Sequence, residues 1–170
     1  MKENRQRNLT RGLLLIYLLV LTWIILFKMQ INLSYIGRMQ YRNVNLIPFQ
    51  GSAVVNGRIE LSEIILNVIA FVPFGVYISM LKENRNWFQK AIPVFLTSFI
   101  YETLQYVFAI GASDITDLLG NTLGGLIGIL LFWLLSKILK ENTIKIVNAL
   151  AVTGTILMIL FMGVLIIANL

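Results

Sequence analysis

Five runs of mostly apolar residues divide this chain, and they restrict its fold more than any other feature. They cover residues 13–29, 61–81, 91–110, 117–135 and 146–168. A helix needs roughly 20 such residues to cross the hydrocarbon core of a bilayer. The whole chain is 58% hydrophobic and only 13% charged, whereas a soluble domain has about 25% charged residues. The sequence therefore predicts an all-α, polytopic membrane helical bundle with about five transmembrane helices.

The basic residues predict the direction of these helices. Alternating sides of the membrane would hold ten and four of the 14 lysines and arginines, and the richer side is expected to face the cytoplasm. The N-terminus is then inside and the C-terminus outside, in a multi-pass membrane protein. No small-residue cleavage site follows the first run, so it is expected to be an uncleaved anchor. The long connection, residues 30–60, lies outside, as a surface helix or dipping back into the protein.

Composition also narrows the chemistry. The chain has no cysteine and no histidine, which removes thiolates, the usual general base and the commonest metal ligand. We expect no metal and no cofactor. The net charge of +6 is explained by residues that set membrane orientation, so nucleic acid is not an expected partner.

Carboxylates and amides occur inside the apolar runs, where a central carboxylate costs about 2.5–3.5 kcal/mol. The set comprises Glu63, Asn67, Glu102, Gln105, Asp114, Asp117 and Asn121. The predicted directions place all of them toward the outer leaflet, on three different helices. The inner half of the bundle carries no comparable set. The last run, with Asn148 as its one amide before residue 168, is expected to be a plain lipid-facing helix.

Several of these residues also have structural interpretations. Asp114 followed by Asp117 resembles a capping box at a helix start, and Asn121 can serve as an interhelical hydrogen-bonding residue. Glycines 120, 124 and 128 form a row that favours close helix packing. Glu102 is different, because its own helix offers no cation from residue 91 on. Arg42 and Arg58 of the outer connection are its candidate partners, and we interpret Glu102 as a functional residue.

Four motifs follow one another along the chain: "NLIPF" (residues 45–49), "ILNVIAFVPFG" (65–75), "YETLQ" (101–105) and "DITDLLGNTLGGLIG" (114–128). Together they resemble the VanZ-like family of bacterial membrane proteins, which implies a place in the bacterial cytoplasmic membrane. The resemblance implies ligand-binding roles for Asn45, Asn67, Glu102, Gln105, Asp114, Asp117 and Asn121. It divides the chain into an anchor helix with the start of the outer loop (1–44), a VanZ-like core of three transmembrane helices (45–136), and a basic loop with the C-terminal helix (137–170).

The resemblance implies lower susceptibility to lipoglycopeptide antibiotics such as teicoplanin. The outer polar residues would form a pocket that binds membrane lipid, a lipid-linked wall precursor or the antibiotic itself. Two alternatives stay open: a membrane enzyme that uses the carboxylates on a lipid-linked wall substrate, and a small transporter or flippase. The sequence is also compatible with an oligomer.

Overall fold

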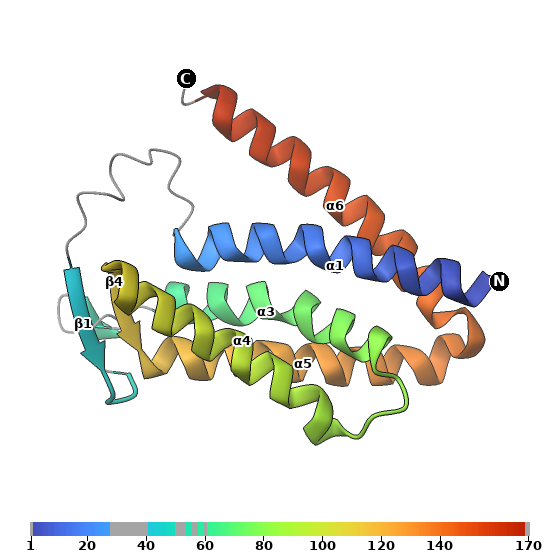
Figure 1. Ribbon diagram of the computed structural model, residues 1–170, viewed down its shortest axis with the longest axis horizontal. Coiled ribbons are helices and arrows are strands. Elements are labelled where there is room, and N and C mark those ends of the chain that lie inside the picture. The colour runs from blue at the N-terminus through green and yellow to red at the C-terminus, as the bar shows by residue number, and fades with distance from the viewer. Residues whose placement is uncertain (1, 28–40, 50–53, 56–57, 60, 169–170) are drawn as a thin grey trace.

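The computed structural model describes residues 2–27, 41–49, 54–55, 58–59 and 61–168, and long helices dominate it (Figure 1). Each helix lies over a run that the sequence predicts as membrane-spanning; residues 28 and 29 of the first run lie outside the described residues. The helices are α1 (Lys2–Leu26), α3 (Leu61–Leu81), α4 (Trp87–Phe108), α5 (Ile115–Leu139) and α6 (Thr143–Ala168), with a short 3-10 helix η2 (Lys140–Asn142) between the last two. The prediction of a helical fold is confirmed.

Four described stretches are long and apolar enough to cross a membrane. They are Asn4–Leu26, Leu61–Leu81, Trp87–Phe108 and Ile115–Val164. The fourth has 50 residues and contains α5, η2 and most of α6. The chain is therefore a helical membrane protein.

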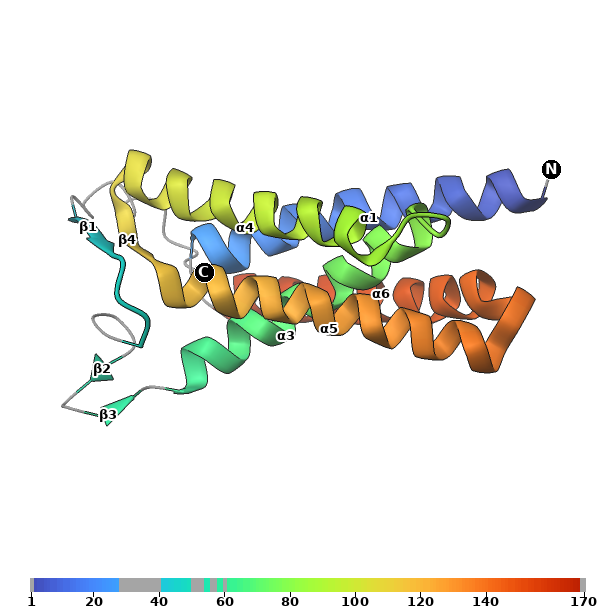
Figure 2. The ribbon, with the colours of Figure 1, turned by 90° about the horizontal axis from the view of Figure 1, so that it is seen from below.

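The bundle has two distinct ends (Figures 1 and 2). The start of α1, the α3–α4 turn and η2 lie together at one end, which we call the basic end. At the other, the strand end, β1 (Tyr41–Asn45) pairs in parallel with β4 (Ile110–Asp114). A second pair, β2 (Val54–Val55) and β3 (Arg58–Ile59), is antiparallel. Of the two alternatives for the outer connection, a surface helix is not what residues 41–49 form, because they form β1 and a turn. Residues 30–40, 50–53, 56–57 and 60 lie outside the described part of the chain.

Glycines bring the backbones of α3 and α5 into direct contact. A Cβ added at Gly124 would lie 2.1 Å from the carbonyl oxygen of Val68, and one at Gly128 would lie 2.0 Å from that of Val72. Gly75 faces α5 in the same way, because a Cβ added at Gly75 would lie 2.0 Å from the carbonyl oxygen of Gly125. The predicted packing role of the glycine row is thus confirmed. Gly120 is looser, since its added Cβ would meet nothing closer than 3.7 Å.

The last helix is held to the first by buried hydrogen bonds. Thr10 Oγ1 donates to Asn148 Oδ1 at 3.0 Å, and Asn148 Nδ2 donates to Gln6 Oε1 at 2.8 Å. Thr10 and Asn148 are each only 1% exposed. The expectation that α6 is a plain lipid-facing helix is therefore wrong, because Asn148 is buried and bonded to α1. Asn148 finds its partners on α1. The sequence of α6 alone therefore could not predict that Asn148 is buried and hydrogen-bonded.

Candidate functional site

Asp114 connects the strand end to the start of α5. It is the last residue of β4, and its Oδ1 accepts a 2.8 Å hydrogen bond from the backbone N–H of Thr116. This is N-cap geometry, which satisfies one of the unpaired donors of the first turn. The predicted capping role of Asp114 is confirmed. In a capping box, the backbone N–H of Asp114 would donate to the side chain of Asp117. In the structure this N–H donates instead to Glu102 Oε2 of α4 at 2.8 Å.

The motif "NLIPF" reaches the same point from a distant part of the chain. Asn45 lies opposite Asp114 in the β1–β4 ladder, and its Nδ2 donates to Asp114 Oδ2 at 3.0 Å. Four residues on, the backbone N–H of Phe49 donates to Thr116 Oγ1 at 3.0 Å. Asn45, Glu102 and Asp114 thus form one set, which we call the strand-end network.

A polar cavity of about 200 Å³ lies beside this network, between α1, α3, α4 and α5. Its lining consists of Ile24, Ile25, Glu63, Leu66, Asn67, Gln105 and Asp117. Asn67 Nδ2 donates to Asp117 Oδ1 at 2.7 Å, which joins α3 to α5 across the lining. Three of the predicted ligand-binding residues therefore meet at one cavity.

Gln105 is the most buried polar side chain of this lining. It is 2% exposed, and its Nε2 donates to the backbone oxygen of Ile25 at 2.9 Å. That oxygen belongs to the last turn of α1, where helical carbonyls lack intrahelical partners. Gln105 Oε1 is buried and has no hydrogen-bond partner among the described residues. An unpaired buried acceptor costs about 1–3 kcal/mol.

The remaining candidates are placed elsewhere. Asn121 is 0% exposed, and neither its Oδ1 nor its Nδ2 has a hydrogen-bond partner in the described part of the protein. It does not line the polar cavity. The side chains of Arg42 and Arg58, expected as partners of Glu102, lie outside the described residues.

Glu63 was missed as a candidate by the family motifs. It lies one helical turn before Asn67 and lines the same cavity. The i to i+4 spacing of these two residues in the sequence already places them on one helix face. Across the described residues, no group of three or more Asp, Glu, Cys or His side chains is arranged to hold a metal ion. The carboxylates of Glu102, Asp114 and Asp117 accept hydrogen bonds from backbone or amide N–H groups.

Comparison with known proteins gives the chain a family. No solved structure shows a significant match. The family model described as VanZ/LLP1 matches residues 14–136, which include both the strand-end network and the polar cavity. The chain is also 37% identical to Protein VanZ of Enterococcus faecium over 154 residues, which cover 91% of this chain and 91% of that protein. This chain therefore belongs to the VanZ/LLP1 family.

Proposed function

We propose that this protein lowers bacterial susceptibility to lipoglycopeptide antibiotics such as teicoplanin by binding part of an envelope molecule in the polar cavity. Membership of the VanZ/LLP1 family supports the proposed link to these antibiotics. The cavity supports the binding step. Its single most telling feature is Gln105 Oε1, a buried acceptor without a partner among the described residues, in a lining that also carries the carboxylates of Glu63 and Asp117.

The proposed orientation places this cavity in the outer leaflet. Five spans run with the N-terminus inside and the C-terminus outside, in the bacterial cytoplasmic membrane. The start of α1, the α3–α4 turn and η2 share the basic end (Figure 1), and ten of the 14 lysines and arginines lie in or beside those segments. The positive-inside rule then puts that end in the cytoplasm. The strand end faces outward, where wall precursors and the antibiotics are met.

The size of the cavity limits the bound group. Drug-sized ligands occupy pockets of about 300–1,000 Å³, whereas this cavity has about 200 Å³. A headgroup or one sugar ring of an envelope lipid or wall precursor fits that volume better than a whole glycopeptide does. The bound group would offer hydroxyl or amide donors, because Gln105 Oε1 and the carboxylates present acceptors.

The proposal is tested by teicoplanin susceptibility in a susceptible bacterium that expresses variants at matched membrane levels. Asp117→Asn keeps an oxygen for Asn67 but removes the charge, and Gln105→Met removes the unpartnered acceptor at similar volume. We expect both to reduce resistance toward that of cells without the protein. Thr103→Ala is the control, since Thr103 is exposed and donates only within α4, to the oxygen of Phe99. Full resistance in both cavity variants would refute the proposal.

A further inference from the structure

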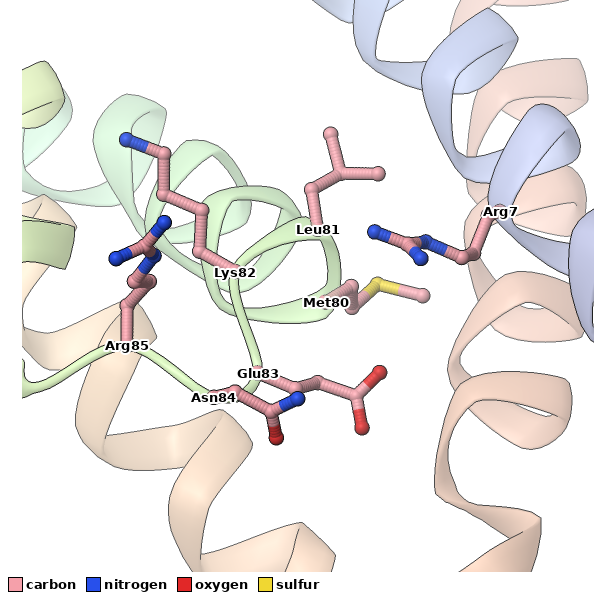
Figure 3. A pocket seen from close by; sticks show the side chains of 7 residues that line it. All are labelled: Arg7, Met80, Leu81, Lys82, Glu83, Asn84 and Arg85. Carbon is pink, nitrogen blue, oxygen red and sulfur yellow. The ribbon is translucent and has the colours of Figure 1, made fainter.

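A second hollow lies at the basic end, far from the polar cavity. It has a volume of about 690 Å³ and is enclosed by the start of α1 and the α3–α4 turn (Figure 3). Its lining consists of Arg7, Met80, Leu81, Lys82, Glu83, Asn84 and Arg85. Three of these side chains are cationic and one is anionic. We call this feature the basic hollow.

Hydrogen bonds in the turn after α3 hold the backbone of Lys82 and Arg85 in place. The backbone N–H of Lys82 donates to the oxygen of Ile78 at 2.9 Å, and that of Arg85 donates to the oxygen of Lys82 at 3.0 Å. Asn86 then caps α4 through a 2.8 Å bond from the backbone N–H of Gln89. The turn is thus anchored to a helix on each side, so Lys82 and Arg85 project from a defined backbone.

The side chains divide the hollow into two walls. Figure 3 shows Lys82 and Arg85 beside each other on one side of the turn, whereas Glu83 points to the other side. Arg7 points from α1 toward the turn and forms the opposite wall. Adjacent like charges repel each other, and an anion between or above them removes that repulsion. Arginine and lysine are the usual protein partners of phosphate oxygens.

Met80 and Leu81 are the two apolar residues of the lining, which is otherwise polar or charged. Met80 is 1% exposed and belongs to a buried cluster with Leu13 and Tyr77.

Two tryptophans place the hollow at the level of lipid headgroups. Trp87 begins α4, directly after the turn, and its ring lies 6.2 Å from that of Trp133 on α5. Lys137 Nζ lies 3.8 Å from the ring centroid of Trp133. Both indoles are partly exposed, at 46% and 39%. Tryptophan concentrates where bilayer and water meet, so this region of the basic end lies at a membrane surface.

We propose that the basic hollow binds the phosphate of an anionic phospholipid headgroup from the leaflet at the basic end. Lys82 and Arg85 contact the phosphate oxygens, and Arg7 contacts the headgroup from the opposite wall. The site is independent of the polar cavity and of the proposed effect on antibiotics.

The test uses purified full-length protein in detergent, titrated with phosphatidylglycerol or with phosphatidylcholine, and bound lipid is counted by native mass spectrometry. The variant is Lys82→Gln with Arg85→Gln. The control is Lys140→Gln with Lys145→Gln, which removes the same charge from exposed positions at the same end but outside the hollow. Since each cation near an anionic surface contributes on the order of a fivefold change in affinity, we expect about a tenfold or larger loss of phosphatidylglycerol binding in the first variant and less than about a threefold loss in the control.

Three results would overturn the proposal. Equal losses in both double variants would mean that total charge alone attracts the lipid. Equal affinity for phosphatidylglycerol and phosphatidylcholine would mean that no anionic headgroup is selected. Displacement of phosphatidylglycerol by equimolar inorganic phosphate would identify free phosphate, and not a lipid, as the ligand.

Discussion

The backbone N–H of Asp114 donates a 2.8 Å hydrogen bond to Oε2 of Glu102, and this bond joins the last turns of α4 to the start of α5. Both residues are buried, at 1% and 4% exposure. A carboxylate inside an apolar helix thus has a structural role, because it accepts a backbone donor at the point where β4 becomes α5. Gln105 lies on α4 close to Glu102, and Asp117 lies in the first turn of α5. The bond therefore also positions two residues of the polar cavity.

Replacing Glu102 should separate the loss of charge from the loss of the acceptor. Glu102→Leu leaves the buried N–H of Asp114 without this acceptor, and the expected loss of stability is about 1–3 kcal/mol. Glu102→Gln retains an oxygen for the same bond and should lose clearly less. Thermal unfolding of the purified variants in one detergent measures both. Equal losses would show that charge, and not the bond to Asp114, is what Glu102 contributes.

The glycine row offers a matched pair of substitutions. Gly124→Ala puts a methyl group 2.1 Å from the oxygen of Val68, whereas Gly120→Ala meets only ordinary contacts at 3.7 Å. Overpacking of this kind costs about 1–3 kcal/mol, and alanine otherwise favours a helix over glycine by about 1 kcal/mol. We expect a lower melting temperature for Gly124→Ala and an unchanged or higher one for Gly120→Ala. The reverse order would contradict the α3–α5 packing described above.

The amide of Asn148 should control the attachment of α6 to α1. The chain has no cysteine, so Leu13→Cys with Val147→Cys introduces a single reporter pair, from one buried cluster. A short bifunctional maleimide should crosslink this pair efficiently. Adding Asn148→Leu removes the bonds to Thr10 and Gln6, each interhelical bond being worth about 0.6–2 kcal/mol, and should reduce the yield. An unchanged yield would show that apolar packing alone holds α6.

Single cysteines also test the orientation. Leu46 at the strand end is 74% exposed, and Asn142 is exposed in η2 at the basic end. With a membrane-impermeant maleimide, Leu46→Cys should react in intact cells and Asn142→Cys only after lysis. Labelling of Asn142→Cys alone in intact cells would reverse the proposed topology.

The helices and the cap at Asp114 could be predicted because their causes are local. An apolar run of sufficient length predicts a span, and an aspartate before such a run predicts an N-cap. The packing role of the glycine row could be predicted for the same reason, since residues four apart share a helix face. These features depend on neighbours within a few residues of the same helix.

The remaining features depend on which segments meet. Asn45 and Asp114 are 69 residues apart, and neither short strand predicts its partner. Gln105 donates to a carbonyl of α1 because that helix ends beside it, which the sequence of α4 does not encode by itself. Asn148 was misinterpreted for the same reason. Long-range pairings decide which polar residues line the cavity and which hold the bundle together.

If the polar cavity carries the proposed effect on antibiotics, a bulky side chain that fills the cavity should abolish that effect. Leu66 lines the cavity, and its neighbour Ile65 does not; their exposures are 54% and 53%. The measurement is the minimal inhibitory concentration of teicoplanin for cells expressing Leu66→Trp or Ile65→Trp at equal membrane levels. We expect Leu66→Trp to reduce resistance toward that of cells lacking the protein and Ile65→Trp to preserve it. Full resistance with Leu66→Trp, or equal loss in both variants, would contradict it.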